Sequence, residues 1–169
     1  NNINDTTVRA SVREAGGDPT TIEFVELAFP DMQAALERGQ VDAIQVVEPF
    51  LTGGMNAGST LVASNYVDTA DDLTIGAYFT TGAVADSDPE LVKKFTNAMN
   101  KSLDYAQENP DAVRDVLLTY TKIDAATAEA LILPSFVTEI NRSGVETLAE
   151  LSLSDGLITE DPQLDELLP

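Results

Sequence analysis

The stretch Pro30–Phe50, PDMQAALERGQVDAIQVVEPF, contains two apolar patterns of different period, separated by a glycine. Pro30 suits the first turn of a helix, and the apolar residues after it recur at helical spacing as far as Gly39. Glycine suits the end of a helix because it adopts positive φ without steric cost. The run Ala43–Val47 is almost continuously apolar, which is typical of a strand covered on both faces. The stretch therefore predicts a helix, a tight turn and a buried strand that stops at Glu48.

Strand and helix patterns alternate on both sides of this stretch. The predicted strands are residues 21–27, 43–47, 60–64 and 75–81. Helices are predicted at residues 4–15 and 30–39, and a short one follows Pro49 and is interrupted by Gly53 and Gly54. Such alternation favours an α/β fold with a parallel or mixed sheet, whose ligands bind beyond the carboxyl ends of the strands.

The C-terminal half has a helical pattern throughout. Asp88 and Pro89 form a capped start for a long amphipathic helix that ends near Asn109. Further helices are predicted at residues 111–121, 124–133 and 145–153, and residues 68–72 are predicted as a polar loop. We therefore divide the chain into an α/β ligand-binding lobe, residues 1–83, and a mainly helical part, residues 84–169. Neither half alone would bury much apolar surface, so both are expected to share one core as a single compact unit.

Charge excludes one class of partner. The 169 residues include 29 Asp and Glu but only nine Lys and Arg, a formal net charge of −20. This field repels phosphate backbones, so nucleic acid is not an expected partner. Acidic side chains spread along a chain serve mainly to keep it soluble.

The composition also removes most catalytic chemistry. The chain has no Cys and no His, which excludes disulfides, thiol nucleophiles, imidazole acid/base catalysis and Cys/His zinc sites. It has no phosphate-binding glycine loop, no serine nucleophile motif and no calcium loop of EF-hand spacing. The sequence therefore predicts a binding protein without cofactor or metal, and the lack of Cys suits a compartment outside the cytoplasm.

One motif resembles a known family. The residues Ala35–Ala43, ALERGQVDA, are followed by a short apolar run and then by Glu48-Pro49-Phe50. This combination resembles the solute-binding proteins of nitrate, sulfonate and taurine type ABC importers, and the related binders of thiamine-pyrimidine precursors. The resemblance extends from Asn4 to about Leu133.

The resemblance implies a fold and a function. The fold would be a periplasmic-binding-protein-like (type II) lobe with C-terminal helices, and a further lobe would precede Asn1. The function would be capture of a small polar or anionic molecule (sulfonate, nitrate, taurine or pyrimidine-like) by cleft closure, for delivery to an ABC transporter permease. An extracytoplasmic location, periplasmic or on a cell-surface lipoprotein, follows from that role. A homodimer of the chain, covering the exposed half of the cleft, is a further expectation.

The resemblance also implies candidate ligand-binding residues at the edge of the cleft. They are Asn4, Asp5, Thr6, Thr7, Glu48, Pro49, Tyr78 and Thr80. Each type of residue has a structural alternative: the first four could cap a helix, Glu48 could cap or brace a hinge, and Tyr78 could lie in the core. Two other functions also stay open on the same fold, a pyrimidine-synthase-like enzyme and a ligand-sensing domain. Such enzymes use active-site His and Cys, and this sequence has neither.

Overall fold

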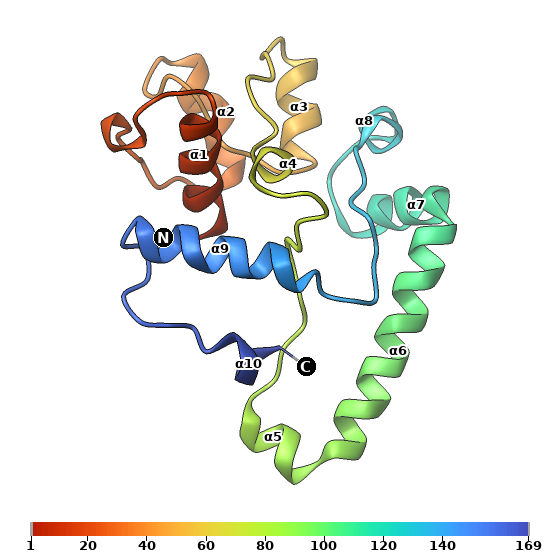
Figure 1. The fold of residues 1–169 in the computed structure, drawn as a ribbon. Helices are drawn as coiled ribbons and strands as arrows, with labels where there is room; N and C mark the ends of the chain where they lie inside the picture. The colour runs from red at the N-terminus through yellow and green to blue at the C-terminus, as the bar shows by residue number, and fades with distance from the viewer. Residues whose placement is uncertain (1, 169) are drawn as a thin grey trace. The chain divides into compact units, whose positions relative to one another are not determined.

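The computed structural model describes residues 2–168 (Figure 1). These residues divide into two compact units. The first unit contains residues 2–46, 58–76 and 141–168, and the second contains residues 47–57 and 77–140. The boundary expected near residue 83 falls inside the second unit, within a helix. The interpretation of residues 1–83 and 84–169 as two parts of one core stays a prediction.

All regular elements among the described residues are helical. The first unit holds α1 (Ile3–Glu14), the 3₁₀ helix η1 (Pro19–Thr21), α2 (Phe29–Glu37), α4 (Asn65–Thr69), α9 (Arg142–Ser154) and α10 (Leu164–Leu167). The second unit holds α3 (Phe50–Asn56), α5 (Gly82–Ser87), α6 (Pro89–Glu108), α7 (Pro110–Tyr120) and α8 (Ala125–Ala130).

The predicted sheet is wrong. Residues 2–168 contain no strand, and the segments at 43–47, 60–64 and 75–81 are irregular, as are residues 22–27. Val62 is 89% exposed and Phe79 is 91% exposed, so these segments are not covered on two faces. Apolar patterning shows which side chains favour burial, but a strand also needs a second backbone with which to exchange hydrogen bonds. No such pairing forms in the described chain, and the α/β, periplasmic-binding-protein-like lobe is replaced by a helical fold.

The helix start predicted at Asp88 and Pro89, which depends on local capping, is confirmed, whereas the N-cap of α1 is Asn2 and not a residue of Asn4–Thr7. The Asp88 side chain accepts a hydrogen bond from the Leu91 backbone N–H at 3.0 Å, and Pro89 occupies the first turn of α6. The chain breaks between α6 and α7 at Asn109, and Gly39 follows α2 with φ of +66°. These features act over three or four residues, which is why the sequence predicts them.

Other local predictions fail. Gly53 and Gly54 lie inside α3 and do not interrupt it. The polar loop predicted from Asp68 begins within α4, and the helices α5 and α10 were not expected. The helix predicted at residues 124–133 ends at Ala130. These elements are four to seven residues long, and at that length neither a glycine nor a polar run decides the conformation alone.

The first unit is built around α1, which packs against α4 and α9. Two threonines of α1 are its most deeply buried side chains, Thr6 at 2% and Thr7 at 0% exposure. The guanidinium of Arg9 lies 4.6 Å from the centre of the Phe24 ring, a cation–π contact. Thus a polar helix face, rather than an aliphatic one, forms much of this core.

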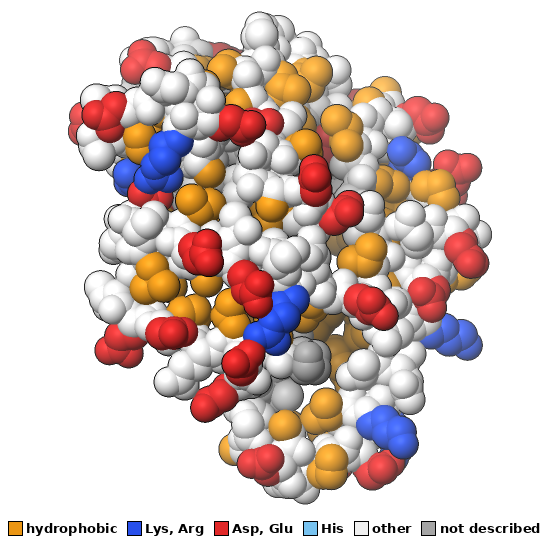
Figure 2. All heavy atoms as spheres, in the orientation of Figure 1, with side chains coloured by type: hydrophobic (Ala, Val, Ile, Leu, Met, Phe, Trp, Pro, Cys, Tyr) orange, Lys and Arg blue, Asp and Glu red, His pale blue; other side chains and the backbone are white. Residues whose placement is uncertain are grey.

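The second unit buries few apolar side chains. Ala128 and Leu131, at and after the end of α8, are 1% and 5% exposed. None of the α6 residues, all of which the structure describes, is buried. Figure 2 shows acidic side chains scattered over the visible face, with hydrophobic side chains between them. Across the described residues, no helix is both long and apolar enough to cross a membrane.

Candidate functional site

The N-terminus of α1 carries four of the eight predicted ligand-binding residues. Its N-cap is Asn2, whose side-chain oxygen accepts from the backbone N–H groups of Asn4 (2.9 Å) and Asp5 (3.4 Å). The N–H of Thr6 donates to the Asn2 carbonyl at 3.2 Å. The residues Asn4–Thr7 therefore lie inside the helix and do not cap it, and three of the first-turn donors are already satisfied.

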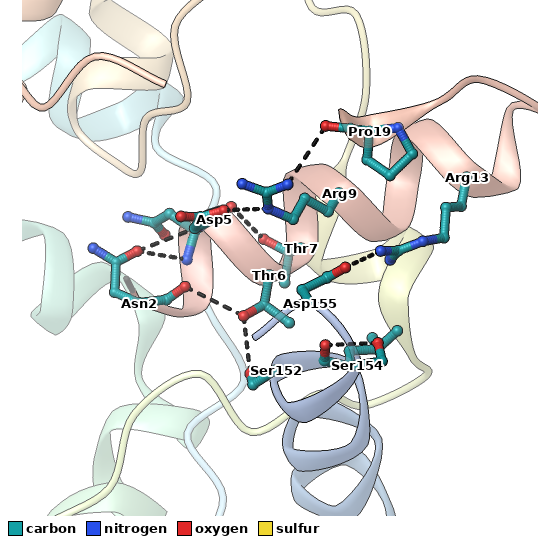
Figure 3. Close-up of polar contacts among 12 residues, drawn as sticks. Asn2, Asp5, Thr6, Thr7, Arg9, Arg13, Pro19, Ser152, Ser154 and Asp155 are labelled. Carbon is teal, nitrogen blue, oxygen red and sulfur yellow. Dashed lines mark hydrogen bonds and ion pairs between the residues drawn. The ribbon is translucent and has the colours of Figure 1, made fainter. Parts of the chain in front are cut away.

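The side chains of this turn are engaged within the protein (Figure 3). Asp5 forms an ion pair with Arg9 at 2.7 Å, one helical turn later. The hydroxyls of Thr6 and Ser152 lie 3.0 Å apart, which links α1 to α9. The Thr7 hydroxyl donates to the Asn4 carbonyl at 3.2 Å. Three of the four side chains thus already have a structural role, and their ligand contacts stay predictions.

The fourth side chain, Asn4, belongs to a separate polar cluster. The Tyr66 hydroxyl, on α4, donates to the Asn4 side-chain oxygen at 2.6 Å. Burial raises the pKa of the Tyr66 phenol, and a hydrogen-bonding interaction with the Gln45 side chain opposes that shift. The amide oxygen of Gln45 is buried and has no hydrogen-bond partner among the described residues. We call Asn4, Gln45 and Tyr66 the amide–phenol cluster.

Sequence reasoning found only Asn4 of this cluster. Gln45 is the one polar residue in the apolar run Ala43–Val47, and that interruption was the available signal. Tyr66 follows the predicted strand at residues 60–64, where nothing in the spacing distinguished it. Asn4 and Tyr66 meet because α1 packs on α4, and Gln45 joins them from the irregular segment between α2 and α3.

Glu48 has three hydrogen-bond donors around its carboxylate, all within the second unit. The backbone N–H and the hydroxyl of Thr52 donate at 3.0 and 2.8 Å. The backbone N–H of Ile132 donates at 3.1 Å. Pro49, joined to Glu48 by a cis peptide bond, is the N-cap of α3. The geometry agrees with the capping alternative for Glu48, and ligand contact by Glu48 and Pro49 stays a prediction.

The last two predicted residues are exposed. Tyr78 is 70% exposed, so it does not lie in the core. Its ring meets that of Phe95 edge-on, with centroids 5.7 Å apart. Thr80, two residues later, is also exposed. The structure therefore places the candidates in two sets: Asn4–Thr7 in the first unit, and Glu48, Pro49, Tyr78 and Thr80 in the second.

A shallow open groove of about 490 Å³ lies elsewhere in the first unit. Its lining includes Ser11, Glu14 and Asp68, and the Ser11 hydroxyl donates to Asp68 at 3.1 Å. None of the eight predicted residues lines this groove. Within residues 2–168, no group of three or more acidic side chains is placed to hold a metal ion.

Comparison with known proteins identifies the family. The sequence model described as NMT1/THI5 like matches residues 1–113. The chain belongs to the NMT1/THI5-like family. The matched part of this NMT1/THI5-like chain contains all eight predicted ligand-binding residues and the whole amide–phenol cluster. Searches of curated proteins and of solved structures find no match.

Proposed function

We propose that this NMT1/THI5-like protein captures a small polar molecule for an ABC importer and does not transform it. The observation that carries the proposal is the family match over residues 1–113, which includes the motif at Ala35–Ala43 and Glu48. The partners are then a small-molecule ligand and a transporter permease, and the working location is outside the cytoplasm.

Binding without chemistry agrees with the residues available. The chain has no His and no Cys, so the pyrimidine-synthase-like alternative lacks the imidazole and thiol groups that such an enzyme would use. Two carboxylates that could act as acid or base are already engaged: Asp5 pairs with Arg9, and Glu48 accepts three protein hydrogen bonds. Their geometry supports structural roles over catalytic ones.

The proposed mechanism is a shift in conformational population. A ligand that makes contacts only in a closed state favours that state by its difference in binding free energy between the two states. The transporter would then recognise closure, and no covalent step is needed. Asn4 and the other predicted residues remain the candidates for those contacts.

A thermal-shift panel tests the proposal. The purified chain is heated with 4-aminopyrimidine, pyrimidine, taurine, ethanesulfonate or nitrate, each at matched ionic strength. A ligand at about 100 times its Kd adds about 2.7 kcal/mol to the free energy of unfolding, so a true ligand raises the melting temperature measurably. Sodium chloride at the same ionic strength controls for general salt effects.

The same samples separate binding from turnover. Mass spectrometry of a stabilising probe, after prolonged incubation, is expected to recover it unchanged. Consumption of the probe would support the enzyme alternative, and a panel with no stabilising member would contradict small-molecule capture of these classes.

A further inference from the structure

We propose that the amide–phenol cluster of Asn4, Gln45 and Tyr66 is a ligand subsite that accepts an N–H group of an uncharged or cationic ligand. The hydrogen bond would run from the ligand nitrogen to the amide oxygen of Gln45. This inference rests on the proposed function and narrows its ligand class. It excludes simple anions such as nitrate from this subsite.

The starting observation is a buried acceptor without a donor. The Gln45 oxygen is inaccessible and has no hydrogen-bond partner among the described residues. Buried polar atoms in native proteins nearly always have a partner, so an unpaired one indicates a place for a water, an ion or a ligand. An oxygen acceptor specifies the chemistry of that group, because only a donor or a cation can satisfy it.

The orientation of the Gln45 amide follows from the proton on Tyr66. That proton is donated to the Asn4 side-chain oxygen at 2.6 Å, so the phenol oxygen can only accept from its other neighbours. Gln45 interacts with the phenol and lowers its pKa, the direction expected when an N–H group faces the phenol oxygen. Rotating the amide would instead bring two acceptors together. The Gln45 nitrogen thus faces Tyr66, and its oxygen is the atom left unsatisfied.

The surroundings disfavour an anion. The first unit has 18 acidic and four basic side chains, whereas the second has 11 and five. At the nearby start of α1, the side chain of Asn2 already accepts from the N–H groups of Asn4 and Asp5. A helix N-terminus binds anions through such free N–H groups, and these two are taken. Both charge and hydrogen-bonding capacity therefore favour a donor ligand.

Access to the cluster is consistent with a reversible ligand. Asn4, Gln45 and Tyr66 are each half-buried, although the Gln45 oxygen itself is covered. A ligand that binds at the edge of the cluster would therefore have to displace the side chains that cover that oxygen. Aromatic or aliphatic amines and ring N–H groups all meet the requirement.

Two matched probe pairs test the donor requirement on the unmodified protein. 4-Aminopyrimidine differs from pyrimidine, and taurine differs from ethanesulfonate, by an amino group. We expect isothermal titration calorimetry to give at least tenfold tighter binding for an amino member of a pair than for its partner. The variant Gln45→Leu should reduce that affinity at least tenfold, whereas Gln33→Leu, a half-buried glutamine of α2 in the same unit, should leave it within twofold.

The possible outcomes are distinct. Binding of nitrate, ethanesulfonate or pyrimidine with an affinity equal to that of the amino probes would overturn the donor subsite and leave small-molecule capture intact. If the Gln45→Leu variant binds an amino probe as tightly as the wild type does, the ligand site lies outside the cluster and the subsite proposal is wrong. If Gln45→Leu fails to fold, Tyr66→Phe replaces it. We expect the same tenfold loss of affinity, because the Tyr66 phenol orients the Gln45 amide. Absence of binding by every probe would overturn both the subsite and the proposed function.

Discussion

The carboxylate of Glu48 accepts a hydrogen bond at 3.1 Å from the backbone N–H of Ile132, 84 residues later in the chain. The same carboxylate holds the N–H and hydroxyl of Thr52 at the start of α3. Hydrogen bonds to an ionised group contribute more than neutral ones. We expect Glu48→Ala to lower the free energy of unfolding by about 2 kcal/mol, as measured by urea denaturation.

Glu139→Ala is the matched control, because Glu139 is an exposed carboxylate of the same unit. It should change the free energy of unfolding by less than about 0.5 kcal/mol. If Glu48→Ala is as harmless as its control but weakens binding of a probe, Glu48 contacts ligand and does not brace the fold.

The Thr6 and Ser152 hydroxyls join α1 to α9 at 3.0 Å, and Thr6 is 2% exposed. Thr6→Val preserves the shape of the side chain and removes the hydroxyl. We expect the free energy of unfolding to fall by about 1 kcal/mol, because the substitution removes the buried hydroxyl that bonds with Ser152. A double-mutant cycle with Ser152→Ala should give a coupling energy of about 0.5 kcal/mol or more. Strict additivity of the two substitutions would show that this bond adds nothing to stability.

Asp155 depends on Arg13 for charge compensation. The two side chains form an ion pair between the C-cap residue of α9 and α1, and the Asp155 side chain is only 7% exposed. Its second oxygen is buried without a partner among the described residues. Arg13→Leu removes the positive charge beside this carboxylate. We expect the free energy of unfolding, measured by urea denaturation, to fall by about 2 kcal/mol. Arg38→Leu, at an exposed arginine of the same unit, should cost less than about 0.5 kcal/mol in the same assay.

Two glycines should respond oppositely to alanine. Gly39 has φ of +66°, where a Cβ is strained, so Gly39→Ala should cost about 1 kcal/mol. Gly53 lies inside α3 with open space where a Cβ would stand. Gly53→Ala should stabilise the protein by about 0.5 to 1 kcal/mol. Thermal melts of the two variants measure the contrast, and a loss of stability in Gly53→Ala would contradict the helical assignment of α3.

Asp124 should contribute a pH-dependent component of stability. Its carboxylate caps α8, and the Thr127 backbone and side-chain hydrogen bonds lower its pKa below the ordinary 3.8. Because the folded pKa is the lower one, the contribution is present above the ordinary value and is lost as pH falls through the folded pKa. Asp124→Asn keeps a capping side chain but does not titrate.

The melting temperature is therefore compared across pH 2 to 7. The difference between the wild type and Asp124→Asn should shrink below about pH 4. Asp86→Asn, in α5, controls for the loss of one negative charge. A constant difference across the whole range would show that the ionised form of Asp124 has no special role.

The parts of the fold that the sequence predicted are those governed by near neighbours. The start of α6 at Asp88 and Pro89, and the turn at Gly39, depend on atoms within four residues. The motif at Ala35–Ala43 is also local in the sequence, and it indicated the family that the match over residues 1–113 confirms. Strand prediction failed because periodicity contains no information about a pairing partner.

The candidate site also has features that the sequence determined and features that only the tertiary structure decided. The sequence by itself determined the family, the acidic charge, the absence of His and Cys, and Asn4 and Glu48 as polar residues of interest. Only the tertiary structure decided their neighbours: Tyr66 for Asn4, and Ile132 for Glu48. Helix caps are fixed by short-range hydrogen bonds that the order of residues specifies, whereas these contacts join residues 62 and 84 positions apart and form only when helices pack.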